Sequence, residues 1–586
     1  MENWWDRFPE AFEAEQAALD AWGEPWTIDK AEFGAGRLVV RIATKVAGQV
    51  RELLAIYPDS YPYFMPQVEM REVQLPKHHN RHGYLCLLAD DGALWRPGTD
   101  TLAGLLQEQL PRLELVTNPT ADADVVAENE DHVAEPIANY LPYTDRSAII
   151  VPDELPPKAA TSGGLQLLAR QGGGRSWIVA ILKQVTDINS EPLVDFPVEL
   201  LSFNERISGF WVRLKERPNL GISTDPEALN QLYKLAFEGL PAFQKRLRTA
   251  REGAVFVLGL LYEDEVTWRE SGEDWVFIWV KITKSAKGGR NPSSAEAEYS
   301  FVRADWAGER SLLMRAPALA PLRMKSVLLV GLGAIGSPLA LQLAKSGVRE
   351  IHAIDMDHLQ VGNSVRWALG WSLSGHPKSG VIASHVQNEY PRTKVIPSGI
   401  RIGAHAMTPE GAPFSDYNFL RGLTEGVDLV IDASANYRVN HLLADMATRE
   451  KKPYLWLSTT SGAAGGLVGR VVPGRTAGCW HCCQLALTTG KVAPPTDAGT
   501  TEVQPRGCTH PTFVAAGIDS DEVALLAARV AVATLVAQDG ESGQAADFAW
   551  DLAVGDFFEG PRRIAPRWAT YPLEVHPECK FCGTVV

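Results

Sequence analysis

Long apolar runs are missing from this sequence. No stretch of about 18 uninterrupted apolar residues occurs, which excludes a helix that spans a bilayer, and we expect no membrane partner. The first residues, Met-Glu-Asn-Trp-Trp-Asp-Arg, lack the charged-then-apolar pattern of an export signal. The sequence therefore predicts a cytoplasmic protein.

An excess of positive charge is also missing. Lysine and arginine number 56 against 71 aspartates and glutamates, which gives a formal net charge of −15. A protein that coats nucleic acid needs many cations to displace counterions from phosphates, so we expect no nucleic-acid partner. A local basic pocket for a nucleotide is still compatible with this charge.

Cysteine is scarce and unevenly placed. The seven cysteines are Cys86, Cys479, Cys482, Cys483, Cys508, Cys579 and Cys582. An odd number without an export signal excludes a disulfide framework. Six of the seven lie in the last 108 positions, and four of these form two Cys-x-x-Cys pairs. Metal binding, thiol chemistry and inert burial are the roles left open.

The composition that remains is that of a globular protein, with 45% hydrophobic and 22% charged residues over 586 positions, enough for about four domains. No internal repeat is present, and the patterns divide the chain into three parts, at 1–140, 141–305 and 306–586. The first part mixes helix and strand patterns, which predicts an α+β domain. These patterns are an amphipathic helix at Phe8–Trp22, a strand at Gly36–Thr44, a helix at Thr101–Leu110 and a solvated acidic connection at Asp122–Glu135.

The middle part carries no chemical motif, and we assign it only as an α/β linker domain of unknown role. It combines strand candidates with one helix and one polar loop. The strands are expected at Trp177–Leu182, Val255–Tyr262 and Trp275–Ile282, the helix at Pro226–Ala236 and the loop at Lys284–Glu296.

A glycine loop opens the chemistry of the third part. The apolar run Ser326–Val330 predicts a buried parallel strand, and it leads into Gly331-Leu332-Gly333-Ala334-Ile335-Gly336 and a helix at Ser337–Lys345. Such glycines let backbone N–H groups and the helix N-terminus approach phosphate. The next strand, Glu350–Ile354, ends in Asp355, 19 residues after Gly336, where a carboxylate can accept ribose hydroxyl hydrogens. A merely structural turn is the alternative, and the loop alone does not decide between NAD and ATP.

Two cations after this strand favour ATP. Arg366 and Lys378 suit an enzyme that cleaves between the α- and β-phosphates, where negative charge develops, although either side chain alone is also compatible with an exposed surface charge. From about Arg310 to the last residue, the sequence resembles the adenylating (ThiF-type) domain of ubiquitin-activating enzymes and of the sulfur-carrier adenylating enzymes. The resemblance implies a Rossmann-like fold and a homodimer. It also implies that Asp355, Asn363, Arg366 and Lys378 bind ATP with Mg²⁺ and assist adenylation.

One position departs from this family. Its members usually carry Asp-Asn after the strand that matches Asp428–Ile431, and that aspartate helps to hold Mg²⁺; here the pair reads Ala435-Asn436. Our hypothesis is that Asp432 substitutes for it. An arginine that reaches the ATP site of the partner subunit in this family is matched weakly by Arg310 or Arg315.

The two Cys-x-x-Cys pairs, at Cys479–Cys482 and Cys579–Cys582, place four thiolates on two tight turns, which suits tetrahedral Zn²⁺. The 96 residues between the pairs exceed a simple zinc ribbon, but matching pairs occur in the adenylating family. Free buried thiols and a redox pair are the alternatives. Cys483 and His481 are alternative ligands, although we favour a bystander role for both.

Cys508 follows a stretch rich in Thr, Gly and Pro that predicts a mobile loop, and Asp519–Ser520 predicts the N-cap of a helix that begins near Glu522. A thiol on such a loop can capture an acyl-adenylate as a thioester. Its position within the activating-enzyme pattern favours this role over an inert loop cysteine; His510 is a weaker candidate for assistance.

Around Cys86, three features resemble a ubiquitin-conjugating domain: a proline-rich passage at Tyr57–Pro66, a His-x-Asn turn that ends at Asn80, and Trp95-Arg96-Pro97. The family places proline where His79 stands, and its cysteine eight rather than six residues after the asparagine. The resemblance implies that Cys86 carries a thioester and that the Asn80 amide stabilises the oxyanion. The alternative is a core cysteine beside exposed histidines His78, His79 and His82.

A conjugating-type domain ahead of an adenylating domain resembles bacterial fused conjugating–activating enzymes, including those of CBASS anti-phage operons. The resemblance implies that ATP activates the C-terminus of a ubiquitin-like protein or a CD-NTase, that Cys508 and then Cys86 carry it, and that a target lysine accepts it. A sulfur-carrier adenylyltransferase, an NAD-dependent dehydrogenase and a non-catalytic binding scaffold are the rival readings.

Overall fold

The computed structural model describes residues 2–88, 94–118, 120–130, 133–170, 178–284, 296–404, 406–407, 413–499, 503–504, 514–540 and 547–582. The chain forms two compact units, which we describe separately. The first comprises Met1–Pro197 and Phe203–Gly308, and the second comprises Val198–Ser202 and Glu309–Val586. Among the described helices, none has the length and apolar character needed to cross a membrane.

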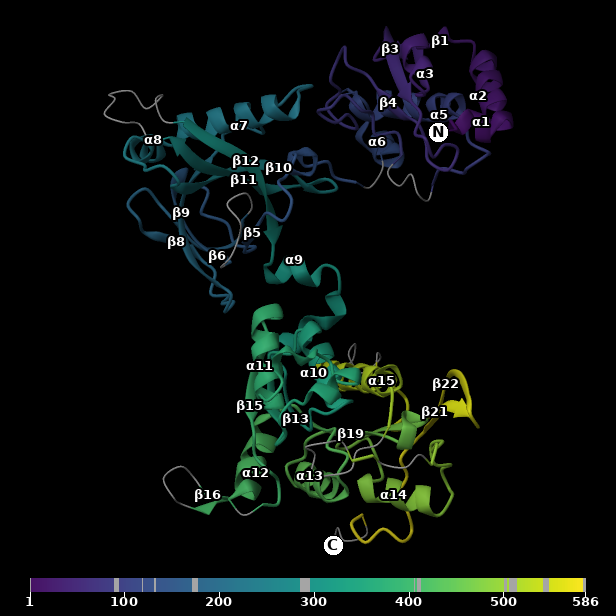
Figure 1. Ribbon diagram of the computed structural model, residues 1–586, viewed down its shortest axis with the longest axis vertical. Coiled ribbons are helices and arrows are strands. Elements are labelled where there is room, and N and C mark those ends of the chain that lie inside the picture. Colours follow the sequence, from purple (N-terminus) through teal and green to yellow (C-terminus); the bar gives the residue numbers. More distant parts are fainter. Residues whose placement is uncertain are drawn as a thin grey trace. The chain divides into compact units, whose positions relative to one another are not determined.

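The N-terminal part of the first unit is a four-stranded antiparallel sheet with helices beside it (Figure 1). The strands are β1 (Trp26–Ile28), β2 (Val39–Val46), β3 (Gln49–Ile56) and β4 (Gln67–Glu69). The helices are α1 (Trp4–Arg7), α2 (Pro9–Trp22), α3 (Lys30–Gly34), α5 (Leu102–Thr117) and α6 (Ala123–Asn129). Trp4 lies in the middle of the core, stacked on Tyr57.

The predicted helices and strand of this part are confirmed, with two differences. Helix α5 starts where expected, because the Thr101 hydroxyl oxygen accepts a hydrogen bond from Gly104 N, but it runs seven residues further than predicted. The stretch Asp122–Glu135, predicted as a solvated connection, contains helix α6, whose first N–H groups are capped by Asp122. The Asp122 N-cap stabilises a helix within this acidic stretch, where the charge pattern had predicted none.

The second part of this unit is a closed β-sheet with two helices. Strand β5 pairs with both β12 and β7, which joins the two ends of the order β5-β12-β11-β10-β9-β6-β7. Neighbouring residues of β10, Val257 and Leu258, point to opposite faces and belong to two separate cores. The strands are β5 (Ala148–Val151), β6 (Ser162–Arg170), β7 (Val179–Thr186), β8 (Pro192–Asp195), β9 (Phe203–Arg213), β10 (Val255–Thr267), β11 (Glu270–Lys284) and β12 (Glu296–Trp306).

Helices α7 (Asp225–Gly239) and α8 (Pro241–Leu247) cover the core that contains Leu258. The helix and the strands expected in this part are confirmed as α7, β7, β10 and β11, although β7 begins at Val179 and Trp177, the first residue of the predicted strand, lies outside the described residues. The predicted loop at Lys284–Glu296 lies, apart from its two end residues, outside the described residues.

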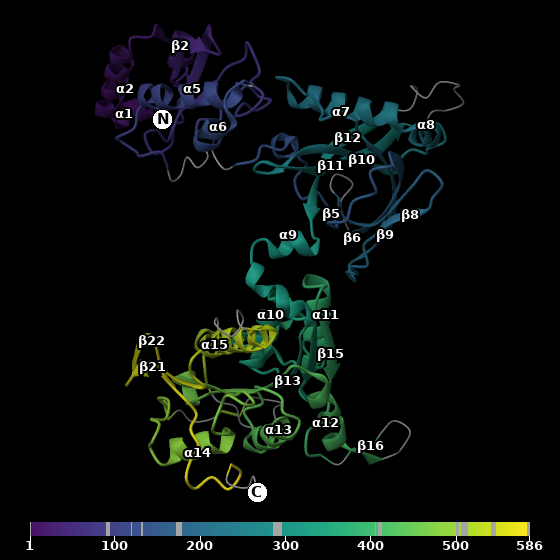
Figure 2. The same cartoon turned by 180° about the vertical axis from the view of Figure 1, so that it is seen from behind.

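The second unit is a sheet covered by helices on both faces (Figures 1 and 2). Its strand order is β15-β14-β13-β18-β19-β20-β21-β22; the first five are parallel and the last three antiparallel. These strands are β13 (Ser326–Val330), β14 (Glu350–Ile354), β15 (Lys394–Ser398), β18 (Leu429–Asp432), β19 (Tyr454–Thr459), β20 (Gly465–Val471), β21 (Leu552–Glu559) and β22 (Arg562–Tyr571). A small separate sheet pairs β16 (Ala406–Met407) with β17 (Pro413–Phe414).

Alternate residues of β13 serve the two faces: Val327 and Leu329 pack with α10, α11 and α15, whereas Leu328 and Val330 pack with α12, α13 and α14. This is the doubly covered parallel sheet that the strand–glycine loop–helix pattern predicts. The helices are α9 (Glu309–Leu313), α10 (Gly336–Lys345), α11 (Lys378–Glu389), α12 (Asp416–Gly426), α13 (Tyr437–Arg449), α14 (Trp480–Thr488) and α15 (Gly517–Val536).

The predicted start of the last long helix is wrong. Helix α15 begins at Gly517, and Asp519 and Ser520 lie inside its first turn rather than at its N-cap. The Asp519 carboxylate binds Arg563, and the Ser520 hydroxyl donates to backbone carbonyls of the preceding turn. The helix begins at a glycine that packs closely against another segment, since a Cβ at position 517 would lie 2.9 Å from the carbonyl oxygen of Val365.

Candidate functional site

The glycine loop joins β13 to α10 at the carboxyl edge of the sheet. Gly331 has φ +90°, and a side chain there would meet the carbonyl oxygen of Ala433 at 2.6 Å. A Cβ on Gly336 would lie 1.9 Å from the carbonyl oxygen of Gly331, whereas nothing lies within 4 Å of a Cβ on Gly333. Strands β14 and β18 flank β13 on opposite sides, so the loop lies where the strand order reverses and where ligands of such sheets bind.

Asp355, at the end of β14, lies against this loop. Its carboxylate accepts hydrogen bonds from Leu332 N at 2.6 Å and from Asp357 N at 2.8 Å. Burial raises the pKa of Asp355, and the positive charge of Lys378 acts in the opposite direction. Lys378 is itself buried at the first turn of α11, where its Nζ lies 3.0 Å from Asp357 Oδ2. The structure thus brings Asp355 and Lys378 together, and it adds Asp357 to the pair.

Asn363 and Arg366 come from a 3₁₀ turn at Val361–Val365. The Asn363 side-chain oxygen accepts from Gln360 N at 3.0 Å, and its carbonyl accepts from Arg366 N at 2.9 Å. Burial lowers the pKa of the Arg366 guanidinium. Trp367, next in the chain, donates from its indole nitrogen to Leu332 O at 2.6 Å, which fastens this segment to the glycine loop.

Sequence reasoning missed Trp367 and Ser337. The Ser337 hydroxyl donates to Gly333 O at 2.8 Å and accepts from Ala368 N at 3.2 Å, so it joins the loop to the same segment. A tryptophan within a polar stretch was the available signal, since a buried indole needs a hydrogen-bond acceptor.

Asp432 lies differently from our hypothesis. It is 0% exposed at the end of β18, and its carboxylate accepts from Ser434 N at 2.9 Å and from the Tyr454 hydroxyl at 3.2 Å. Burial raises its pKa. A Mg²⁺ ligand needs an oxygen open to the ion, so this environment does not fit the metal role, and Asp432 instead fixes the turn that packs on Gly331. Arg310 and Arg315 are both exposed.

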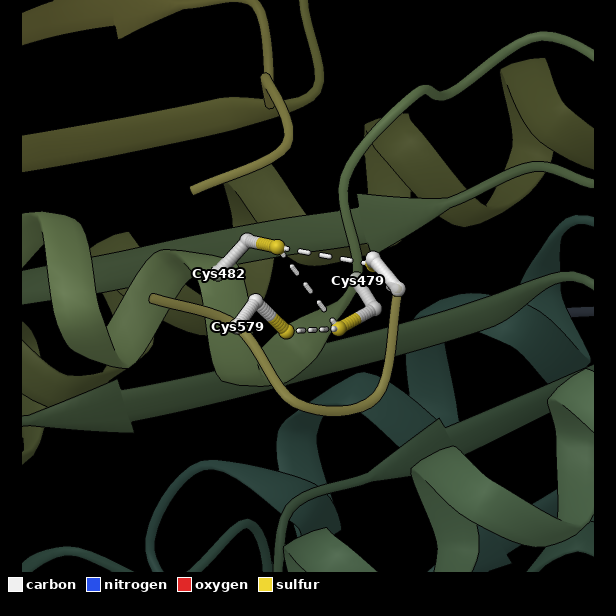
Figure 3. A group of neighbouring side chains, drawn as sticks. Cys479, Cys482 and Cys579 are labelled. Atoms are coloured by element: carbon white, nitrogen blue, oxygen red, sulfur yellow. Dashed lines mark hydrogen bonds between the residues drawn. The ribbon is translucent and has the colours of Figure 1, made fainter. Parts of the chain in front are cut away.

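The four cysteines of the two pairs converge. Figure 3 labels three of them, Cys479, Cys482 and Cys579. Their sulfurs all lie within 4.8 Å of one another; Cys479 is 3.8 Å from Cys482 and 3.7 Å from Cys579, and Cys482 is 3.5 Å from Cys582. Zinc–sulfur bonds of about 2.3 Å in a tetrahedron place sulfurs about 3.8 Å apart, so this set fits Zn²⁺. His576 N also donates to Cys482 Sγ at 3.3 Å, as groups around metal thiolates do.

The neighbours of this cluster stay outside it. Cys483 is buried in the core below, where burial raises its pKa to about 12. His481 lies against Phe581, with ring centroids 4.2 Å apart, and against His441. Neither Cys483 nor His481 belongs to the group of four sulfurs.

Cys508 and His510 lie outside the described residues. Among the described residues that follow, Gly517 at the start of α15 packs against Val365 and Arg366.

Cys86 lies beside α5 in the N-terminal part. Its N–H donates to His78 O at 2.8 Å, and its partly exposed thiol lines a cavity of about 20 Å³. The thiol is hydrogen-bonded to Glu135 and Tyr140, from the segment that leads to the middle part. Burial and the negative charge of Glu135 raise the pKa of Cys86 to about 12.

Asn80 forms a tight turn before Cys86. Its side-chain oxygen accepts from His82 N and from Tyr84 N, both at 3.0 Å, which leaves the NH₂ group as the available donor. Asn80 lines a second, larger cavity of about 490 Å³, which Cys86 does not line. Glu135 and Tyr140 do line it, so they stand between the cavity and the thiol.

The family of the second unit follows from comparison with known proteins. Residues 309–552 match the ThiF family, and the C-terminal part of the chain is therefore an adenylyltransferase domain of that family with a Rossmann-like sheet. Its glycine loop, Asp355 and Lys378 lie within the matched range. This family implies ATP as a substrate and Mg²⁺ as the metal ion that accompanies it.

One relative aligns with the chain over nearly its own whole length. The protein is 30% identical to "Uncharacterized protein y4oA" of Sinorhizobium fredii over 605 residues, which cover 100% of this chain and 98% of that protein, and it belongs to the same family. It is 28% identical over 300 residues to "ATP-dependent ubiquitin transferase-like protein Cap2" of Enterobacter hormaechei, with 48% of this chain and 47% of Cap2 covered. Among solved structures, Escherichia coli MccB with ATP is similar at 18% identity over 47% of this chain and 70% of that chain, with a TM-score of 0.34.

Proposed function

We propose that this protein uses ATP to activate the C-terminal carboxylate of a partner protein, and that two of its cysteines then pass the acyl group to a lysine. One observation carries the proposal: the chain joins a ThiF-family adenylyltransferase domain, with Asp355 and Lys378 at its glycine loop, to a partly exposed cysteine, Cys86. The similarity to Cap2, an ATP-dependent ubiquitin transferase-like protein, supports activation with ATP followed by transfer.

The first step is adenylation. The carboxylate oxygen attacks the α-phosphorus of ATP, the bond to the bridging oxygen breaks, and pyrophosphate leaves. The open space at Gly333 and the N-terminus of α10 accommodate phosphate, while Asp355 faces the ribose. Lys378 and Arg366 stabilise the negative charge that develops during the attack. Mg²⁺ would shield the phosphates; Asp432 does not fit as its ligand.

The next steps form the relay. The Cys508 thiolate attacks the acyl-adenylate, and AMP leaves. Cys86 then takes the acyl group from Cys508, and a lysine amine attacks the Cys86 thioester with the Asn80 amide as a donor to the oxyanion. Two thiols in one chain have a higher effective concentration than the same thiols on separate enzymes.

The four cysteines Cys479, Cys482, Cys579 and Cys582 would hold Zn²⁺ with a structural role. Four thiolates at these distances repel one another, so these cysteines would need a bound Zn²⁺ to offset part of their charge, and they would then tie the C-terminal segment to α14. We further propose a homodimer, a ubiquitin-like protein or a CD-NTase as the activated partner, and a role in anti-phage defence.

Incubation with ATP, Mg²⁺ and candidate partner proteins, followed by non-reducing gels, tests the proposed function. We expect a DTT-sensitive adduct that Cys508→Ala abolishes and that Cys86→Ala stops at the first thiol. If the adduct needs Cys508 but never reaches Cys86, the proposed conjugation step is wrong and the activity is that of a sulfur-carrier adenylyltransferase. If pyrophosphate exchange and adducts are absent with every partner, the protein is a binding scaffold.

A further inference from the structure

The middle part of the first unit has no role in the relay described above, yet it builds half of the 490 Å³ cavity beside Cys86. One wall comes from the N-terminal part, with Asn80 and Lys77, and the other from strands β10 and β11, with Glu263, Glu265 and Ser271. The connecting segment closes the end nearest the thiol with Glu135 and Tyr140.

Charged contacts fix the two walls against each other. Arg81, which is 4% exposed, binds Asp225 at the start of α7 and donates to Tyr140 O at 2.7 Å. Arg217 donates to Asp264 Oδ1 at 2.8 Å and to Glu135 O at 3.1 Å. The cavity is therefore a built feature of this unit rather than a gap between loosely joined parts.

Carboxylates outnumber cations in the lining. Each lining cation already has a carboxylate partner: Lys77 binds Glu130 and Glu265, Arg81 binds Asp225, and Arg217 binds Asp264. Two lining carboxylates, Glu135 and Glu263, have no partner among the lining cations; Glu263 lies 2.9 Å from Lys158 at the surface. A cation that enters is attracted toward these groups.

Glu135 is the group closest to the chemistry. Its Oε2 accepts from His78 N at 2.7 Å, and its Oε1 lies 3.7 Å from His78 Nδ1, so the carboxylate is held in place. The same carboxylate accepts the Cys86 thiol proton, while the Tyr140 hydroxyl donates to the sulfur. An ammonium group on Glu135 would therefore be next to Cys86.

We propose that this cavity is the acceptor site of the conjugation step, that it takes the side chain of a lysine, and that Glu135 binds the ammonium group. The inference rests on the proposed function and gives the middle part its role. In the reaction, the ammonium group loses one proton to solvent and the resulting amine nitrogen bonds to the acyl carbon. The bond to Cys86 sulfur then breaks, and the thiolate takes the second proton from the nitrogen.

Binding alone tests the site without ATP or a partner protein. The probe is Nα-acetyl-L-lysine amide, observed by saturation-transfer NMR with the full chain, and the matched probe is Nα-acetyl-norleucine amide, which lacks the ammonium group. We expect binding of the lysine probe in the millimolar range, with at least tenfold weaker binding of the norleucine probe. Equal binding of the two probes, or no binding of the lysine probe, would overturn the site.

Variants locate the binding. Ser271→Trp fills the cavity and Glu135→Gln removes the charge; each should weaken binding of the lysine probe at least fivefold. Thr99→Trp and Glu128→Gln, both at exposed positions, are the matched controls and should bind as the wild type does. Unchanged binding in both Ser271→Trp and Glu135→Gln contradicts the proposal. Thermal denaturation identifies any variant that fails to fold, and the comparison of the two probes on the wild type stands without the variants.

A discharge assay links the site to the reaction. Where an activated partner loads Cys86, the lysine probe should discharge the thioester at least tenfold more slowly in Ser271→Trp, while discharge by hydroxylamine, which is small and uncharged, should be unchanged. Equal slowing of both nucleophiles would place the defect at Cys86 and overturn the acceptor site. Failure to load Cys86 at all would refute the proposed function, whereas the binding measurements decide the acceptor site separately.

Discussion

The Cys86 thiol is protonated at neutral pH, because burial and the Glu135 carboxylate raise its pKa to about 12. The thiolate is the reactive form, so alkylation of Cys86 by iodoacetamide should rise about tenfold per pH unit between pH 7.5 and 9.5. Glu135→Gln removes the negative charge, lowers the pKa of the thiol and should accelerate alkylation about tenfold at pH 8.5. Mass spectrometry of the Cys86 peptide measures the rate.

Glu128→Gln is the control for this prediction, since Glu128 is exposed on α6. It should leave the rate unchanged. A rate for Glu135→Gln equal to that of the wild type would show that the carboxylate does not act on the thiol.

The three glycines of the nucleotide loop differ in what a methyl group would meet. Gly336→Ala forces a Cβ against the backbone oxygen of Gly331 and should lower the melting temperature of the second unit. Gly333→Ala meets only open space, so it should leave the melting temperature unchanged and weaken ATP binding, because its methyl group occupies the space for phosphate. Differential scanning fluorimetry with and without ATP separates the two effects. If Gly333→Ala binds ATP as the wild type does, the phosphates of ATP do not bind at this loop.

At the scale of helices and strands, the spacing of apolar residues and the positions of glycine predicted the bounds of an element where those bounds depend only on residues nearby in the sequence. Strand β13 and strand β14 have the predicted bounds, and α10 begins one residue earlier, since apolar runs flanked by glycine determine them locally. The start of α15 and the presence of α6 were not predictable in this way. The first depends on Gly517 packing against Val365, which is remote in the sequence, and the second on a cap within a charged stretch.

The convergence of the two cysteine pairs predicts one Zn²⁺ per chain. Cys582→Ser should lower the zinc content, measured by atomic absorption, and reduce the melting temperature, because the C-terminal segment loses its attachment to α14. Since thiolates must be deprotonated to bind the ion, zinc should be released as the pH falls below about 5. Cys483→Ala, next to the cluster but outside it, should retain the metal; a zinc content that depends on Cys483 instead would refute the ligand set.

A buried ion pair joins β20 to the segment before β21. Arg470, 1% exposed, binds Asp547 Oδ1 at 2.6 Å and Thr534 of α15 at 2.8 Å. Replacement by leucine leaves Asp547 with Arg475, whose side chain is 40% exposed, as its remaining partner and should cost about 3 kcal/mol of unfolding free energy. The pKa of Asp547 is lowered, mainly by Arg470 against the effect of burial, so this stabilisation is complete above the unfolded-state pKa and is lost as the pH falls through the folded-state pKa.

Urea denaturation at pH 7 measures the cost of Arg470→Leu. Arg449→Leu is the comparison, because Arg449 forms an exposed pair with Asp445 and should cost less than about 1 kcal/mol. Equal costs for the two variants would contradict the assignment.

At the scale of the whole molecule, the sequence predicted which residues carry the chemistry better than it predicted which residues surround them. The glycine loop and Asp355 were recognisable because their spacing follows from one strand–loop–helix–strand unit, whereas Lys378 was assigned from its charge and from the resemblance to the adenylating family. The cover of Cys86 by Glu135 and Tyr140, and the cavity walled by β10 and β11, join segments far apart in the chain. No local pattern encodes such contacts, so a sequence alone does not reveal the surroundings of Cys86.

The most direct test of the account follows one acyl group through the intact chain. The protein is incubated with ATP, Mg²⁺ and a partner that supports pyrophosphate exchange, and the thioester is located by mass spectrometry of acid-quenched digests. The account predicts an ATP-dependent thioester that appears first on Cys508 and then on Cys86, with none on Cys86 in Cys508→Ala. An acylated Cys86 in the Cys508→Ala variant, or a thioester that never leaves Cys508, would contradict it.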